Sequence, residues 1–462
     1  MTMINGGEAV YRVLKANNID TVFGLLGGSM LELYDAMYQG GDIAYVGARD
    51  ERAAGHMADA WARMTGKPGV VLGAQAGPGV VNTVTAVAEA HLAYSPLVVI
   101  AGAFTRADQA KDTFQEVDQV ALFAPICKRS LMVTDPSRLA PMLEDAIRLA
   151  NSGRRGPVVL HVPRDLFPAE VPDIDPMPVN IARPGPAASE DVAAIADMLS
   201  EARRPVIFAG AGFKWGAGRE ALTALAEALE IPVVASTGHA DVMRHGHPWF
   251  AGQAGPRGNR VASRLTKEAD VMVVLGARLG FNSTFHSNEY VGADTRIAHV
   301  DIDGAAVGRY FPAEIAVQAD APLTADALTL AASKPSADDW RAAFKADMAG
   351  LAAERAEEAR IATMPMHPRR ALAEIRGTLP EDAIVTLDTG NTCLQAADRL
   401  AHYAPMSLIT PLDFGLVGFG LAAAIGAKAA APERPVVAVM GDGAIGYTLI
   451  EIQTAVSVSY TH

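Results

Sequence analysis

Cysteine is nearly absent from this sequence. Cys127 and Cys393 are the two cysteines in 462 residues, and they lie far apart in the chain. Disulfide frameworks and cysteine-ligated metal sites need more thiols at closer spacing. We therefore expect two buried, reduced thiols and a reducing compartment.

Long apolar runs and a leader sequence are also missing. The longest apolar run, residues 414–427, is broken by glycines and falls short of the roughly 20 residues that a membrane span needs. Residues 1–7 lack the basic segment and apolar stretch of a signal peptide. These absences predict a cytoplasmic protein with no membrane partner.

Positive charge is in deficit. There are 39 Lys and Arg residues against 52 Asp and Glu residues, a formal net charge of -13. Such a surface disfavours binding to nucleic acid. If an acidic protein of this kind binds an anionic cofactor, we expect a bridging divalent cation or helix N-termini to hold it.

What the sequence does contain is a regular alternation of strand-like and helix-like segments. This alternation predicts α/β domains built on parallel sheets, with ligands at the carboxyl ends of the strands. Helices are expected at residues 80–91 and 447–458. The first apolar strand-like runs are residues 21–26, 43–48, 70–73, 96–102 and 157–162.

The length suits two or three domains rather than one core. Proline-rich residues 167–187 lack periodicity and are expected to form a linker. Residues 334–366 are charged and alanine-rich and are expected to form a helical connection. The three domains are therefore predicted at residues 1–166, 188–333 and 367–462.

A carboxylate stands where one predicted strand passes into a helix. Asp50 is a plausible N-cap, Gly66 a plausible stop, and Glu51 lies in the first turn between them. An acidic residue there often only complements the helix dipole. A buried one is costly unless its proton is used, so Glu51 is a candidate catalytic acid.

Two glycine-rich turns follow other predicted strands. One is residues 77–79, after residues 70–73, and the other is Gly441-Asp442-Gly443, after residues 436–440. Alone, each triplet is equally typical of an ordinary turn. At the end of a strand, however, glycines let backbone amides approach a phosphate, and Asp442 suits a hard divalent cation.

Taken together, the three stretches resemble the thiamine-diphosphate-dependent enzymes, most closely their acetolactate-synthase-like branch. The resemblance spans essentially the whole chain. It implies three doubly wound parallel-sheet domains: pyrimidine-binding, middle Rossmann-like and diphosphate-binding, the last incomplete. It also implies thiamine diphosphate and Mg²⁺ as cofactors.

The same resemblance assigns roles to individual residues. Glu51 is expected to hydrogen-bond and protonate the aminopyrimidine ring, Gln115 to approach the substrate, and Asp442 to bind the metal. Val417 stands where a larger apolar residue, often Met, usually supports the bent cofactor. The expected cofactor contacts are Gly27, Gly28, Gly77, Pro78, Asn82, Gly390, Asn391, Thr392, Gly415, Leu416, Val417, Gly441, Asp442, Gly443 and Ala444.

The implied activity is decarboxylation of a 2-oxo acid, with pyruvate as the expected donor, and carboligation of the remaining fragment to an acceptor. Residues 114–119 are also compatible with a sulfoacetaldehyde-acetyltransferase-like enzyme, and an oxalyl-CoA-decarboxylase-like enzyme is a further alternative. A catalytically silent binding or assembly protein is the alternative from another class. The family places its site between two subunits, which implies a homo-oligomer.

Two features depart from the family pattern. The family completes its metal site with an asparagine pair roughly 25 residues beyond the aspartate, within the same strand–helix–strand unit, and this sequence ends at His462. We therefore expect a chain shortened at its C-terminus. FAD stays open, because Gly276-Ala277-Arg278 matches the acetolactate-synthase branch but residues 279–282 lack its usual acidic residues.

Overall fold

The computed structural model describes residues 2–458, and residues 459–462, on which the expectation of a shortened chain partly rests, lie outside it. The contacts divide the chain into two compact units. The first unit contains residues 1–182 and 413–462, and the second contains residues 183–412. Both are α/β structures with parallel sheets, which confirms the predicted fold class.

The first unit is built on a six-stranded sheet. Its strand order is β3-β2-β4-β5-β7-β6, and all five pairings are parallel. This order is that of a doubly wound sheet, in which helices cover both faces. The strands are β2 (Thr21–Leu25), β3 (Ala44–Gly47), β4 (Gly69–Gly73), β5 (Leu97–Ala103), β6 (Arg129–Met132) and β7 (Val158–Pro163).

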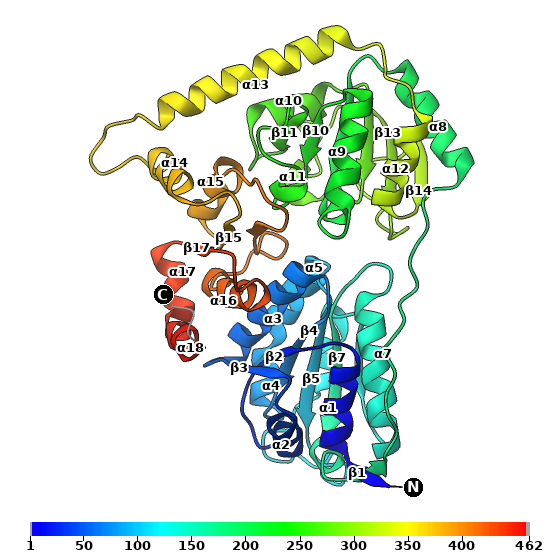
Figure 1. Cartoon of the computed structure of the whole chain (residues 1–462), viewed down its shortest axis with the longest axis vertical. Coiled ribbons are helices and arrows are strands. Elements are labelled where there is room, and N and C mark those ends of the chain that lie inside the picture. Colours follow the sequence, from blue (N-terminus) through cyan, green and yellow to red (C-terminus); the bar gives the residue numbers. More distant parts are fainter. Residues whose placement is uncertain (1, 459–462) are drawn as a thin grey trace. The chain divides into compact units, whose positions relative to one another are not determined.

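Alternate residues of these strands enter two separate hydrophobic clusters. In β4, Val70 and Leu72 belong to one cluster and Val71 to the other. Successive side chains of a strand point to opposite faces, so a sheet covered on both faces needs apolar residues at every position. The first cluster also contains helices α1 (Gly6–Ala16), α2 (Leu31–Gly40) and α7 (Leu139–Asn151), and the second contains α3 (Glu51–Thr65) and α5 (Val84–Leu92) (Figure 1).

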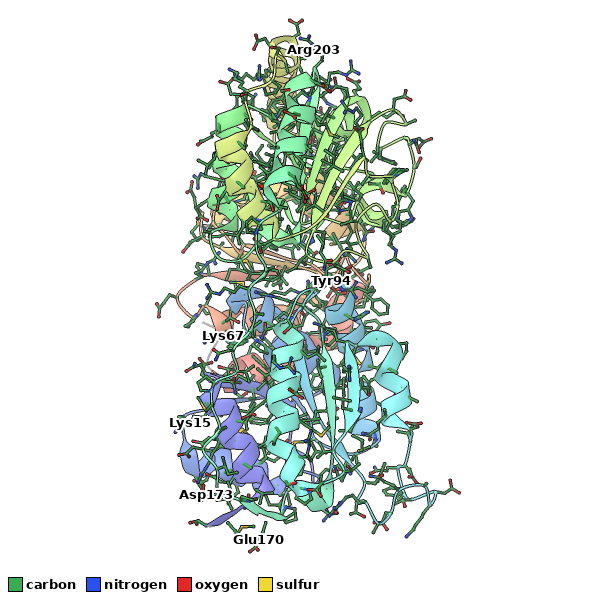
Figure 2. All side chains as sticks on the ribbon, turned by 90° about the vertical axis from the view of Figure 1, so that its right-hand side faces the viewer. Lys15, Lys67, Tyr94, Glu170, Asp173 and Arg203 are labelled. Atoms are coloured by element: carbon green, nitrogen blue, oxygen red, sulfur yellow. The ribbon has the colours of Figure 1, made fainter. Side chains whose placement is uncertain are left out.

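The N-terminal segment is held beside this sheet by a short antiparallel strand pair and an ion pair. Strands β1 (Met3–Asn5) and β8 (Glu170–Pro172) pair antiparallel. Just after β8, Asp173 accepts a hydrogen bond of 2.6 Å from Arg12 of α1 (Figure 2). The predicted linker therefore begins with an ordered strand.

The C-terminal segment contributes α16 (Gly420–Ala430), β17 (Val436–Val439), α17 (Asp442–Thr448) and α18 (Ile452–Ser457). Helix α16 crosses α3 with the two backbones in direct contact. A Cβ atom placed on Gly426 of α16 would lie 2.0 Å from the carbonyl oxygen of Met57. Glycine is required at this crossing because no side chain fits there.

The second unit contains another six-stranded sheet with the order β11-β10-β9-β12-β13-β14 and parallel pairing throughout. Its strands are β9 (Pro205–Ala209), β10 (Val233–Ala235), β11 (Phe250–Gln253), β12 (Val271–Leu275), β13 (Arg296–Asp301) and β14 (Ile315–Gln318). Its helices are α8 (Ser189–Glu201), α9 (Gly218–Leu229), α10 (Arg260–Glu268), α11 (Phe281–Thr284) and α12 (Ala321–Ala331).

The remaining elements of this unit follow the sheet in sequence. They are α13 (Asp338–Glu358), α14 (Pro368–Thr378), β15 (Ile384–Leu387), α15 (Asn391–Arg399) and β16 (Leu408–Ile409), with β15 and β16 parallel. A buried ion pair ties β16 to the segment between β10 and β11. Lys214 lies 3.0 Å from Asp241, and Asp241 accepts the backbone N–H groups of Ser407 and Leu408.

Several elements differ from the sequence-based expectation. The strands β6, β11 and β14 were not expected; all three lie at sheet edges, where burial on both faces is not required. The helix expected at residues 80–91 is divided into α4 (Pro78–Asn82) and α5 at Thr83. The helix expected at residues 447–458 is interrupted by a 3₁₀ turn, η6 (Leu449–Glu451).

No helix within residues 2–458 is long and apolar enough to cross a membrane.

The crossing at Gly426 yields a stability prediction. Gly426→Ala is expected to lower the free energy of unfolding by about 1–3 kcal/mol, because the new methyl group overlaps the Met57 carbonyl. Gly446→Ala is the matched control: its Cβ meets no atom within 4 Å and it lies in α17. The control is expected to be neutral or stabilising by up to about 1 kcal/mol. Urea unfolding of both variants gives the comparison, and equal stability of the two would refute the backbone contact.

Candidate active site

Glu51 is the first residue of α3, and the structure buries it. Its side chain lies at the carboxyl end of β3 with 7 % of its surface exposed. Asp50 caps the helix by accepting the backbone N–H of Arg52 at 2.7 Å. The cap is therefore a different carboxylate, which leaves Glu51 available for another use than helix capping.

The turn after β4 lies directly against this carboxylate. A Cβ atom on Gly79 would stand 2.9 Å from Oε1 of Glu51. From the end of α4, Asn82 donates a hydrogen bond of 3.0 Å to Oε2. Asn82 is the one hydrogen-bond partner of the Glu51 side chain in the part of the chain that the structure describes. Oε1 thus remains able to bond to a ligand.

Two glutamine side chains connect three loops at the same edge of the sheet. Gln75 donates to Oε1 of Gln115 at 3.0 Å, and it accepts the backbone N–H of Gly28 at 3.3 Å. The backbone oxygen of Gln115 lies so close to Gly77 that a Cβ atom there would stand 2.2 Å from it. The structure therefore brings together Glu51, Asn82, the turn at 77–79, Gly28 and Gln115.

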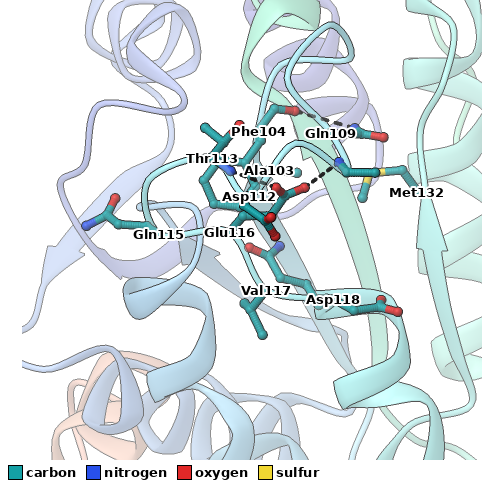
Figure 3. A pocket seen from close by; sticks show the side chains of 12 residues that line it. Ala103, Phe104, Gln109, Asp112, Thr113, Gln115, Glu116, Val117, Asp118 and Met132 are labelled. Carbon is teal, nitrogen blue, oxygen red and sulfur yellow. Dashed lines mark hydrogen bonds between the residues drawn. The ribbon is translucent and has the colours of Figure 1, made fainter.

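The loop that carries Gln115 forms a cavity of about 730 Å³. The conformation of this loop is held by one of its own side chains, because Glu116 accepts the backbone N–H groups of Ala110, Lys111 and Thr113. These bonds, that from Thr113 first, hold the pKa of Glu116 below its usual value. Gln115 has a φ of 71°, and Figure 3 shows its side chain pointing away from those of Asp112 and Glu116.

The cavity walls contain carboxylates and amides but no basic side chain. Its lining residues are Ala103, Phe104, Gln109, Ala110, Asp112, Thr113, Gln115, Glu116, Val117, Asp118, Gln119 and Met132. An anionic substrate group would find no positive partner among them. A positive partner for such a group would have to come from residues outside this cavity wall.

A buried ionic cluster fixes the other end of α3. Arg63 binds Asp59 at 2.6 Å and Glu89 of α5 at 2.9 Å. Glu89 also accepts the backbone N–H of Phe414 at 3.3 Å. Burial is the main cause that raises the pKa of Glu89, and the neighbouring carboxylate of Asp413 adds to it. The cluster attaches the segment at 413–417 to the helices beneath it.

This attached segment contains the predicted residues Gly415, Leu416 and Val417. Leu416 is buried, whereas Val417 keeps 36 % of its surface exposed. Gly415 has a φ of 85°, a left-handed conformation that favours glycine. The predicted wedge position is therefore accessible to a ligand.

The predicted metal motif lies at the start of α17. Gly441 precedes this helix, Asp442 and Gly443 are exposed, and Ala444 is buried. Two contacts connect this region to α3: Glu451 accepts the backbone N–H of Arg49 at 3.0 Å, and Arg52 donates to the carbonyl oxygen of Tyr447 at 3.2 Å. Among the described residues, no group of three or more His, Cys, Asp or Glu side chains is arranged to hold a metal.

Two sets of predicted residues are placed by other constraints. Gly27 lies against Ala74, where a Cβ atom would stand 2.9 Å from its carbonyl carbon. Gly390, Asn391 and Thr392 lie in the second unit, where Gly390 has a φ of 132° and Asn391 begins α15.

The sequence reasoning missed the polar side chains behind the site. No sequence pattern gave a role to Gln75, Gln119, Arg63 or Glu89. Gln119 is buried and accepts the backbone N–H of Gly77 at 2.8 Å. Its partner lies 42 positions away, so no local pattern marks it.

Three family models match successive parts of this chain. The family model described as "Thiamine pyrophosphate enzyme, N-terminal TPP binding domain" matches residues 4–122, the central-domain model residues 192–328, and the C-terminal TPP-binding model residues 388–459. The chain belongs to the thiamine pyrophosphate enzymes. The three matches fall in the order that the sequence predicts for this family.

Individual relatives narrow the branch of thiamine pyrophosphate enzymes. Sulfoacetaldehyde acetyltransferase of Castellaniella defragrans is 34 % identical over 478 residues, covering 97 % of this chain and 78 % of that protein. Acetolactate synthase large subunit of Parasynechococcus marenigrum is 32 % identical, covering 98 % and 74 %. The large subunit of acetolactate synthase isozyme 1 of Escherichia coli is 33 % identical, covering 97 % and 79 %. This thiamine pyrophosphate enzyme is thus in the acetolactate-synthase-like branch.

His56 of α3 gives a pH prediction for this enzyme. Its ring is fully buried against Phe419, and neither ring nitrogen has a hydrogen-bond partner within residues 2–458. Burial, together with Arg52 and Arg63, lowers the pKa of His56 to about 3. The unfolded chain takes up this proton near the ordinary value of about 6.5, so the unfolding free energy falls as pH drops from about 6.5 to about 3.

His56→Leu is therefore expected to keep more of its stability in acid, by up to a few kcal/mol at about pH 4 relative to wild type. Urea unfolding at about pH 7 and pH 4 provides the measurement. The exposed His286 provides the control as His286→Leu. An unchanged acid dependence in His56→Leu would mean that His56 does not set it.

Proposed function

We propose that this enzyme decarboxylates pyruvate and transfers the remaining two-carbon fragment to an acceptor, with Glu51 as the acid that controls the cofactor's protonation. The observation that carries the proposal is a buried carboxylate with one oxygen fixed by Asn82 and the other without a partner among the described residues. Thiamine diphosphate, when bound, supplies the carbanion and the electron sink. The protein supplies orientation and proton control.

The fit to thiamine diphosphate rests on this chain's own atoms. Oε1 of Glu51 lies against Gly79, where a side chain would overlap the carboxylate. A ring nitrogen within hydrogen-bond distance of Oε1 would share a proton with it, while Asn82 keeps the carboxyl plane fixed through Oε2. Val417 is accessible, which suits a residue that would support the cofactor from below.

Mg²⁺ is proposed as the ion that would join the protein to the diphosphate. Mg²⁺ in proteins commonly binds through one or two carboxylates together with phosphate oxygens and water. Asp442 offers one exposed carboxylate between two glycines. The proposed diphosphate contacts in the first unit are Gly441, Gly443 and Ala444. Gly390, Asn391 and Thr392 stay predicted cofactor contacts that the family resemblance implies.

Sulfoacetaldehyde is a second candidate substrate. The relative named sulfoacetaldehyde acetyltransferase matches this chain at 34 % identity, which is as high as the match to acetolactate synthases. Pyruvate would release carbon dioxide on acetyl transfer, and sulfoacetaldehyde would release sulfite. The donor is identified by incubating the enzyme with pyruvate and, separately, with sulfoacetaldehyde, and measuring carbon dioxide and sulfite in each case.

Assembly and location belong to the proposal as well. We expect a homo-oligomer in which the site is completed by a second copy, and a cytoplasmic location. FAD stays a prediction and no part of the chemistry requires it. Light scattering for the oligomer and the absorbance spectrum of the purified protein for a bound flavin test these points.

The first test is Glu51→Gln. Glutamine keeps the shape of the side chain but cannot exchange a proton, so turnover is expected to fall by about 10²-fold or more. Binding of thiamine diphosphate with Mg²⁺, measured by calorimetry, is expected to remain within a few-fold of wild type. Glu433→Gln removes an exposed carboxylate of the same unit and serves as the control.

Wild-type turnover in Glu51→Gln would remove Glu51 from its role. Absence of cofactor binding in the wild-type chain would favour a catalytically silent binding or assembly protein instead.

A further inference from the structure

Gln119 is the first residue of α6 (Gln119–Phe123), and its side chain is buried with all its polar atoms engaged. Oε1 accepts the backbone N–H of Gly77 at 2.8 Å. Nε2 donates to the carbonyl oxygen of Gly102 at 3.0 Å and lies 3.1 Å from Nδ1 of His161. The amide orientation is fixed, because an N–H can only donate and a carbonyl oxygen can only accept.

The hydrogen bonds continue beyond Gln119 in one direction. His161 is fully buried on β7, and its Nε2 lies 2.9 Å from the hydroxyl of Ser130 on β6. Since Nε2 of Gln119 is a donor, Nδ1 of His161 accepts, and Nε2 of His161 donates to Ser130. Burial lowers the pKa of His161 to about 4, which agrees with a neutral ring.

In the other direction, Gly77 connects Gln119 to the catalytic carboxylate. Gly77 begins the turn that leads into α4, with a φ of 75°. The same turn puts Gly79 against Oε1 of Glu51, and α4 ends at Asn82, which donates to Oε2. A displacement of Gly77 would therefore move both groups that surround the Glu51 carboxyl.

We propose that Gln119 is a positioning residue for Glu51: it holds the turn at residues 77–79 in the position that allows the hydrogen bond between Asn82 and Glu51. It acts through the backbone of Gly77, because the polar atoms of its side chain are all engaged by protein groups. The inference rests on the proposed function of Glu51 and extends it to a residue of the loop that also carries Gln115. The hydrogen-bonded chain Gln119–His161–Ser130 would then support that turn.

The decisive variant is Gln119→Glu. When protonated, the introduced acid can accept from Gly77 and donate its one O–H to Gly102, although it cannot also donate to Nδ1 of His161. When ionised, it has no proton to donate and places negative charge against the Gly102 carbonyl oxygen. The titratable groups around it are His161, which faces it from β7, and Asp118, which precedes it and acts on His161.

Turnover of Gln119→Glu relative to wild type is therefore expected to be highest in acid and to fall about tenfold or more as the acid ionises, between about pH 5 and pH 8. The donor KM is expected to change little, because the polar atoms of Gln119 are bonded to protein groups and are not available to the substrate. Gln119→Met, which can form none of the hydrogen bonds, is expected to be slow at every pH. Gln39→Met is the control, an exposed glutamine of α2 in the same unit and outside the cavity wall, and should behave as wild type.

Hydrogen exchange of the peptide containing residues 75–82 provides a readout that does not depend on activity. In Gln119→Met the Gly77 amide loses its acceptor and is expected to exchange faster, whereas Gln39→Met leaves it protected. If the wild-type chain neither binds cofactor nor turns over, the proposed function fails, and this exchange measurement alone decides the role of Gln119. Unchanged exchange in Gln119→Met, or a Gln119→Glu profile parallel to wild type in an active enzyme, would overturn the inference.

Discussion

Direct backbone contact between α3 and α16 is the constraint on which the site depends. Gly426 allows α16 to lie against the Met57 carbonyl oxygen, and Gly55 of α3 similarly faces Ala86 of α5. Helix α3 therefore has no freedom to rotate or slide without creating overlaps, because packed interiors do not yield to added volume. Since Glu51 is the first residue of α3, its location is fixed by packing along the whole helix rather than by its own contacts.

Electrostatics reinforce this arrangement at both ends of the helix. At the N-terminal end, Glu451 accepts the backbone N–H of Arg49. At the C-terminal end, Arg63 binds Asp59 and Glu89, and Glu89 holds the backbone N–H of Phe414. Removing one member of such a buried set leaves the others unpaired, which is costly. The helix that bears Glu51 and the segment that bears Val417 are thus held by shared groups.

The parts of this site that the sequence predicts are those with a local signature. Glu51 follows a strand and a helix cap, and the turn at 77–79 follows another strand, so both could be recognised from neighbouring residues. Their meeting follows from the parallel sheet, which brings strand ends to one edge. Gln119 has no such signature, because its partners at Gly77 and His161 each lie 42 positions away. Edge strands such as β6 are not predicted from the sequence for a related reason, since one-sided burial leaves a weak apolar pattern.

The loop at 104–118 has a consequence for how this enzyme can diversify. Its path is set by the Glu116 carboxylate, whose acceptor bonds are all to backbone of the same short segment. Most of the cavity wall therefore belongs to one self-contained length of chain. Exchange of that length between relatives would replace most of this cavity wall in a single recombination event, while the framework around Glu51 stays as it was.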